Sequence, residues 1–288
     1  MKQAVDCIPC YIKQVISAMR IAGIEEEKHD GVVRGLFPVL GELDPSRSPA
    51  ENSSLVLFEA HRLMGCEDPF KEAKSASNKL ARTFIPALEK ALAASDDPLL
   101  TALKASVAGN AIDMGINPDF DVDESLSREL KREFRIDDSD TFRRLLNKDG
   151  SLVVIGDNSG EIVFDYLLMT YLHEFTGELV YVVKGGPILN DATHEDAEEA
   201  GIHQLARVIT TGNNYLGVIP ELGSPELQSA IASADAVLSK GQANYETLEG
   251  TDFAGDKTFF LLQAKCPVIA AHLGAGLGDS VMVRNKPE

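Results

Sequence analysis

VVIGDNSGEIVFD, residues 153–165, runs from an apolar segment through a glycine and the polar pair Asp157-Asn158 into a helix-like pattern. A strand that leads through a short turn into a helix is the repeating unit of a parallel sheet covered by helices. Asp, Asn and Ser are good helix N-caps, so the pair can be a capped turn and nothing more. It can equally supply a carboxylate and an amide oxygen to a divalent cation. The stretch taken alone leaves both interpretations open.

Short apolar runs rich in β-branched and aromatic residues recur after residue 150, and helix-like stretches separate most of them. The runs are SLVVIG, ELVYVVKG, ARVITTG, DAVLSKG, KTFFLLQ and CPVIAA. Strand alternating with helix predicts a doubly wound α/β domain with a mostly parallel sheet over residues 149–288. Residues 1–148 have helical spacing instead, with polar breaks such as LDPSRSPAENSS, which predicts an all-helical N-terminal domain.

The composition excludes several classes of protein. Across 288 residues, 45 Asp and Glu against 27 Lys and Arg give a net charge of -18, which repels nucleic-acid phosphates. No apolar run approaches the ~18 residues that a membrane span needs. The N-terminus carries an acid and two cysteines where a signal peptide would be apolar, so we expect a cytoplasmic protein. Four cysteines do not indicate a disulfide framework.

Polar, glycine-containing loops follow the first four predicted strands: GDNSGE, KGGPILNDAT, TTGNNYLG and SKGQANYET. Ligands of open parallel sheets bind at the carboxyl ends of the strands. If the first two strands are neighbours, Asp191 lies roughly 5–10 Å from Asp157, because adjacent strands are ~4.8 Å apart. Asp157, Asn158 and Asp191 would then offer three oxygen ligands and leave coordination positions open for substrate. Lys240 and, more weakly, Lys184 are candidates for binding an anion.

Cys7 and Cys10 form a single CxxC pair. One pair is a weak signal for zinc or redox chemistry, since a closed zinc site needs four ligands and only Cys66 and Cys266 remain. The alternative is two thiols on one face of a helix. The sequence contains no histidine pair with metal-binding spacing, no nucleophilic-serine motif, no Walker P-loop and no G-x-G-x-x-G.

Seven segments, taken in order, resemble the metal-dependent damage-control phosphatases: DCIPC, DPFKEAKSASNKLA, AGNAID, GDNSGEIVFD, KGGPILNDAT, SKGQANYETL and AKCPVIA. The CxxC resembles that of the prokaryotic first subfamily. The resemblance implies a helical domain packed on a Rossmann-like α/β domain, with the active site in the cleft between them. It also implies a divalent metal (Mn²⁺, Ni²⁺, Co²⁺ or Mg²⁺) and hydrolysis of small phosphorylated metabolites such as sugar phosphates or damaged nucleotides. One departure is Ala243, where a second glycine is expected.

The resemblance further implies a set of site residues. They are the metal ligands Asp157, Asn158 and Asp191, the phosphate-binding Lys240, the pocket residues Glu161, Asn110 and Asp113, and a metal-chelating pair, Cys7 and Cys10. We hypothesise that a metal-activated water attacks the phosphate, with Asp191 or Glu161 orienting or deprotonating it. Lys240 and the N–H groups near Ser159 would stabilise the developing charge. The rival is a sensor that binds a nucleotide or sugar phosphate without turnover, but a pure anion binder has no use for two aspartates beside phosphate.

Overall fold

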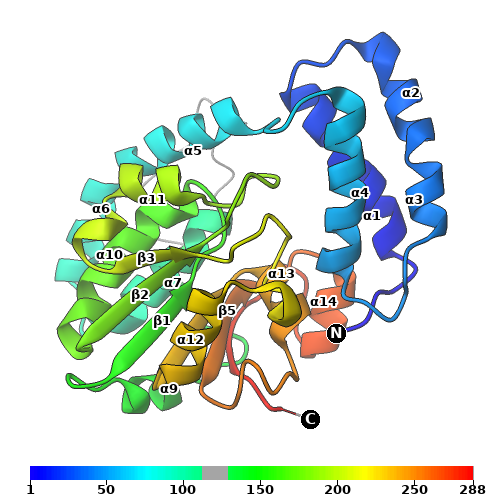
Figure 1. Cartoon of the computed structure of the whole chain (residues 1–288). Helices are drawn as coiled ribbons and strands as arrows, with labels where there is room; N and C mark the ends of the chain where they lie inside the picture. Colours follow the sequence, from blue (N-terminus) through cyan, green and yellow to red (C-terminus); the bar gives the residue numbers. More distant parts are fainter. Residues whose placement is uncertain (112–128, 288) are drawn as a thin grey trace.

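A six-stranded sheet forms the centre of the fold (Figure 1), in a computed structural model that describes residues 1–111 and 129–287. The strands are β1 (Ser151–Ile155), β2 (Glu178–Val183), β3 (Arg207–Thr210), β4 (Ala236–Lys240), β5 (Thr258–Gln263) and β6 (Ser280–Arg284). Their order is β3-β2-β1-β4-β5-β6, with β1 to β5 parallel and β6 antiparallel to β5. The prediction of a mostly parallel α/β fold is confirmed.

One predicted strand is wrong. CPVIAA belongs to helix α14 (Pro267–Leu273), and the sixth strand is the later β6. Cys266 caps the helix by accepting a hydrogen bond from the Ile269 N–H, Pro267 occupies its first turn, and Gly274 ends it in the left-handed conformation. Proline at the start and glycine past the end are helix boundaries, so the local signals outweighed the β-branched pair Val268-Ile269.

Helices cover both faces of the sheet. The side chains of β1 alternate: Leu152 and Val154 join one apolar cluster, Val153 and Ile155 the other. The first cluster includes residues of α10 (Glu161–Phe175) and α7 (Pro98–Ala111), and the second includes residues of α12 (Pro225–Ser233), α13 (Gln242–Leu248) and α14. Burial on both faces explains why the strands read as continuous apolar runs.

The first four helices form a separate bundle at one side of the molecule (Figure 1). They are α1 (Cys7–Ile21), α2 (Glu26–Gly35), α3 (Phe37–Gly41) and α4 (Pro49–Met64). Their apolar cluster also includes Ile188 and Leu216 from loops at the carboxyl edge of the sheet. The predicted break LDPSRSPAENSS covers the start of α4, where Ser48 accepts a hydrogen bond from the Glu51 N–H and caps the helix.

The remaining N-terminal helices pack on the α/β body, chiefly on α10 and β5 and on one another, rather than on the α1–α4 bundle. The sequence EDPFKEAKSASNKLARTFIPALEKALAAS has a helical pattern throughout, but it forms two helices, α5 (Lys71–Thr83) and α6 (Ile85–Ala93), because Pro86 interrupts it. Phe84 and Leu103 share an apolar cluster with β1. The change in sequence pattern near residue 148 therefore does not coincide with a division of the apolar core, and the predicted domain boundary stays a prediction.

The shorter elements complete the description: α9 (Ser139–Leu145), α11 (His194–Ala200), η1 (Ile202–Gln204) and η2 (Pro220–Leu222). Within residues 1–111 and 129–287, no helix has both the length and the apolar character needed to cross a membrane.

Candidate active site

The strand order reverses at β1. From β1 the chain passes through α10 to β2 on one side, and β4 lies on the other side of β1, with Ile155 paired to Ser239. Open α/β sheets bind their ligands in the crevice outside the carboxyl ends of the strands at this reversal. Asp157 follows β1 here, and Lys240 ends β4. The topology thus selects the loop that the sequence singled out.

Backbone hydrogen bonds join the loop after β1 to the loop after β2. Ala192 N–H donates to Asp157 O at 2.9 Å, and Ser159 N–H donates to Asn190 O at 2.8 Å. Asn158 and Asp191 form an antiparallel bridge between these bonds. The three predicted metal ligands are therefore brought together, as the neighbouring positions of β1 and β2 predicted. The adjacent side chains of Asp157 and Asn158 are also bonded to each other: Asn158 Nδ2 donates to Asp157 Oδ2 at 2.9 Å.

Both aspartates are buried, 8% exposed at Asp157 and 4% at Asp191. Burial raises the pKa of Asp157, and the charge of Lys265 is the strongest of those that oppose the rise. Burial also raises the pKa of Asp191 to about 7; Lys184, 3.4 Å away, opposes this, and Asp157 adds to it. Two carboxylates that are desolvated and repel each other would be stabilised by a cation between them.

Lys240 does not line the cavity described below. It is fully buried, and its ammonium group donates to Glu161 Oε1 and Asp165 Oδ1. Burial alone lowers the pKa of Lys240, but these two carboxylates outweigh it and raise the pKa. Tyr181 OH and Ser106 Oγ also donate to Asp165, at 2.6 and 2.7 Å. The structure places the predicted phosphate lysine in a buried cluster beneath the aspartates, and its role stays a prediction.

Glu161 belongs to the same cluster. Burial raises its pKa to about 8; Lys240 opposes the shift, and Asp157 and Asp165 add to it. Its Oε2 atom and Ser159 Oγ are buried without a hydrogen-bond partner among the described atoms. Two buried polar oxygens left unpaired so close to Asp157 are consistent with a ligand that the protein atoms do not supply.

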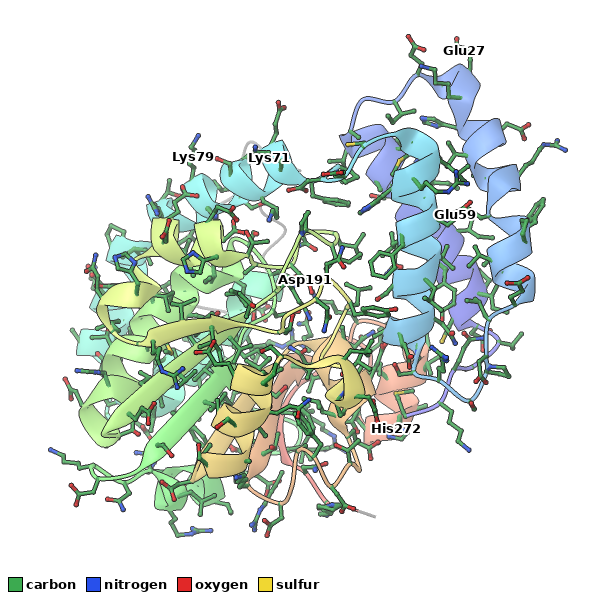
Figure 2. The ribbon with its side chains drawn as sticks, in the orientation of Figure 1. Glu27, Glu59, Lys71, Lys79, Asp191 and His272 are labelled. Atoms are coloured by element: carbon green, nitrogen blue, oxygen red, sulfur yellow. The ribbon has the colours of Figure 1, made fainter. Side chains whose placement is uncertain are left out.

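A cavity of about 590 Å³ opens between the α1–α4 bundle and the carboxyl edge of the sheet. Asp157, Asn158 and Asp191 lie on its wall. The bundle contributes mostly uncharged residues, namely Cys7, Cys10, Tyr11, Gln14, Pro49, Ala50 and Ser53, together with Asp6 from the start of α1. Figure 2 shows Asp191 in the middle of the molecule, between the bundle and the α/β body. The predicted metal ligands thus face a space of the size that holds a small metabolite.

Two residues of this site, Lys265 and Gly241, were not predicted from the sequence. Lys265 follows β5, lines the cavity and opposes the raised pKa of Asp157. Like Lys184 and Lys240, Lys265 lies at or just after the end of a strand at the carboxyl edge of the sheet. It was not predicted because CPVIAA, which begins at the next residue, was wrongly predicted to be a strand. Gly241 has φ +83°, and a Cβ there would lie 2.1 Å from Asp157 Cγ. Only glycine lets the backbone after β4 approach that carboxylate so closely.

Cys7 and Cys10 both line the cavity, together with Cys266 from the start of α14. Burial raises the pKa of each thiol of the CxxC pair. In the part of the chain that the structure describes, no three His, Cys, Asp or Glu side chains are arranged to hold a metal ion. A metal or redox role for the pair stays a prediction. Asp113 lies outside the described residues, and the Asn110 side chain is not described.

The donor set at the end of β1 fits a hard divalent cation. Asp157 and Asp191 supply carboxylate oxygens and Asn158 an amide, the ligands that Mg²⁺ and Mn²⁺ accept. Burial raises the pKa of both aspartates, and a cation bound by them would favour their ionised forms.

Comparison with known proteins gives consistent matches over nearly the whole chain. A family model for the damage-control phosphatase ARMT1-like domain matches residues 3–281. A damage-control phosphatase of Pyrococcus horikoshii is 33% identical over 290 residues, covering 99% of each chain. One of Archaeoglobus fulgidus is 32% identical over 287 residues, covering 98% of each. The crystal structure of a DUF89 family protein from Pyrococcus horikoshii matches with a TM-score of 0.91 and 32% identity, over 99% of this chain and all of that one.

Proposed function

Because the chain belongs to the damage-control phosphatase ARMT1-like domain family and is a phosphatase, we propose that it is metal-dependent and hydrolyses small phosphate monoesters. The observation that carries the proposal is the pairing of two buried aspartates and Asn158 at the reversal point of the sheet, facing a cavity. Sugar phosphates and damaged nucleotides or metabolites are the substrate class we propose.

Asp157, Asn158 and Asp191 would hold the divalent cation, Mn²⁺, Ni²⁺, Co²⁺ or Mg²⁺. A cation bound there would supply positive charge for the phosphoryl group and a nucleophilic water near neutral pH. Lys265 lies on the same cavity wall, and we assign it a contact with the phosphate oxygens.

Asp191 is better placed than Glu161 to orient the attacking water or accept its proton. Both acids are ion paired, Asp191 with Lys184 and Glu161 with Lys240, but only Asp191 lies on the cavity wall. We propose that Glu161 and Lys240 act from beneath the site, where they set the charge around Asp157.

The cavity volume and lining support a small substrate. Pockets of roughly 300–1,000 Å³ bury most of a small ligand, and this cavity is about 590 Å³. Its charged end would take the phosphate, while α1 and α4 provide mostly uncharged side chains for the remainder of the molecule. The α1–α4 bundle is therefore the part of the chain that we expect to select the metabolite.

Release of inorganic phosphate from an aryl phosphate tests the proposal. We expect turnover with at least one of the four divalent cations and its loss on chelation. Asp157→Asn should abolish turnover, while Asp279→Asn should not, because Asp279 accepts a backbone hydrogen bond in a loop that does not line the cavity. Turnover that survives both chelator and Asp157→Asn would refute the metal-dependent scheme. Tight binding of phosphorylated metabolites without turnover would favour the sensor instead.

A further inference from the structure

Helix α5 turns two polar side chains, Lys74 and Asn78, toward the α/β body. Lys74 is 6% exposed and Asn78 is 0% exposed. Lys71 and Lys79 of the same helix point away from the body (Figure 2). The buried stripe of a packing helix is normally apolar, and buried Lys and Asn require partners. Their partners are Gly160 in the loop after β1, Thr193 at the end of the loop after β2, and two acids of α11, which follows that loop.

Asn78 contacts the loop after β1 directly. Gly160 N–H donates to Asn78 Oδ1 at 2.6 Å. Gly160 is the N-cap of α10, two residues after Asn158, and it has no side chain with which to cap the helix itself. Asn78 therefore supplies from α5 the acceptor that this helix start needs, and fixes the loop where it turns away from the site.

The same side chain reaches the element that follows the loop after β2. Asn78 Nδ2 donates to Asp196 Oδ1 at 2.8 Å and to Glu199 Oε2 at 3.2 Å. Asp196 Oδ2 accepts from Lys74 Nζ at 3.0 Å and from both the N–H and the hydroxyl of Thr193 at 2.9 Å. Thr193 lies two residues after Asp191, so the Asp196 carboxylate ties the end of that loop to α5.

We propose that Asn78 is a positioning residue that, with Lys74 and Asp196, fixes the loop after β1 and the loop after β2 at the spacing their metal ligands require. The inference rests on the proposed metal-dependent phosphatase function and adds to it a residue that contacts neither metal nor substrate. The Asn78 oxygen accepts a hydrogen bond from Gly160 in the loop after β1. Its nitrogen donates to Asp196, which in turn is bonded to Thr193 at the end of the loop after β2. Groups that orient ligands in this way typically change metal affinity or activity by about 10–100-fold when altered.

Asn78→Asp is the informative change. An aspartate keeps an oxygen for Gly160 N–H but sets a carboxylate against Asp196 and Glu199. We expect the Kd for Mn²⁺, measured by calorimetry, to rise about 10–100-fold. Asn78→Asp combined with Asp196→Asn restores a carboxylate–amide pair and should recover most of the affinity, as expected of directly coupled residues.

Asn285→Asp is the matched control. Asn285 is also buried, at 2% exposed. Its amide bonds backbone groups instead of carboxylates: it accepts from Gly250 N–H and donates to the carbonyls of Thr251 and Gly255. Burying a new carboxylate there should lower the melting temperature yet leave Mn²⁺ affinity unchanged. Lys74→Met, which removes only an ammonium group, is the second variant should Asn78→Asp fail to fold, and should weaken Mn²⁺ binding several-fold.

Each outcome decides between the alternatives. Weaker Mn²⁺ binding in folded Asn78→Asp, recovery in the double variant and unchanged affinity in Asn285→Asp would support the positioning role. Wild-type affinity in folded Asn78→Asp or, where that variant does not fold, in Lys74→Met would overturn it. Equal weakening in Asn285→Asp, or no recovery in the double variant, would also overturn it. If the unaltered protein binds none of Mn²⁺, Ni²⁺, Co²⁺ and Mg²⁺, the proposed function itself is overturned and the inference with it; if it binds one of the others and not Mn²⁺, the same variants are compared with that cation.

Discussion

Gly241→Ala should displace the Asp157 side chain while leaving every proposed metal ligand chemically unchanged. The new Cβ would lie 2.1 Å from Asp157 Cγ and 2.2 and 2.4 Å from its two oxygens. Carbon atoms prefer about 3.5 Å or more, so the backbone after β4 and the carboxylate must separate by roughly 1.4 Å. Asp157 is only 8% exposed and is surrounded by charged groups, so it cannot yield without changing the site.

The expected loss is large, because a misplacement of about 1 Å can reduce catalysis about 100-fold. We expect kcat/KM for metal-stimulated hydrolysis of an aryl phosphate to fall at least about 100-fold. The Mn²⁺ Kd, measured by calorimetry, should rise at least about tenfold.

Gly278→Ala is the control for backbone strain. Gly278 has φ +84°, against +83° at Gly241, yet no described atom lies within 4 Å of a Cβ built on it. Both variants force alanine into a conformation that costs about 1–3 kcal/mol, but only one meets the carboxylate. If both folded variants lost Mn²⁺ affinity and kcat/KM to the same extent, backbone strain would account for the loss, and the position of Asp157 would not control the site.

Three further predictions test other contacts. Lys265→Met should lower kcat/KM by about 100-fold through loss of the proposed phosphate contact. The control is Lys148→Met, which should leave kcat/KM unchanged because Lys148 is exposed and does not line the cavity. Tyr181→Phe removes a 2.6 Å hydrogen bond to buried Asp165 and should reduce the free energy of unfolding by about 2 kcal/mol in urea denaturation; an unchanged midpoint would refute this. Burial raises the pKa of Glu246 from 4.5 to about 7, so its protonated form favours folding: that stability is complete below about pH 4.5 and lost as the pH rises through 7. Glu246→Gln should therefore gain up to about 3 kcal/mol over wild type between pH 5 and pH 8; parallel stability curves would contradict the assignment.

The sequence predicted most of the parallel strands because β1, β2, β4 and β5 are buried on both faces, and such strands appear as continuous apolar runs. The edge strand β3 is only partly buried. The sequence also predicted that Asp191 approaches Asp157, because that follows from strand adjacency alone. The prediction failed at CPVIAA, where a short buried helix and a buried strand have the same composition. Only Pro267 and Gly274 at its ends distinguished them.

The ion pairs of Lys240 could not be predicted from the position of that lysine at the end of a strand. Its partners, Glu161 and Asp165, lie one turn apart on α10, and which helix face meets β4 is decided by tertiary packing. A signal was nevertheless present. Two acids spaced by four residues interrupt the otherwise apolar EIVFDYLLM, and buried acids on an apolar helix need a cation.

The charges around Asp157 suggest a reason for burying a lysine beneath the proposed phosphate site rather than within it. Four carboxylates (Asp157, Glu161, Asp165 and Asp191) and three lysines (Lys184, Lys240 and Lys265) give a formal charge of -1 when all are ionised. A divalent cation makes this +1, a sign that attracts phosphate, whereas without Lys240 the same ion would leave the site neutral. Lys240 is ion paired to Glu161 and Asp165, so it can contribute this charge without leaving its partners. Lys265 lies on the cavity wall and is the lysine that we propose contacts the phosphoryl oxygens.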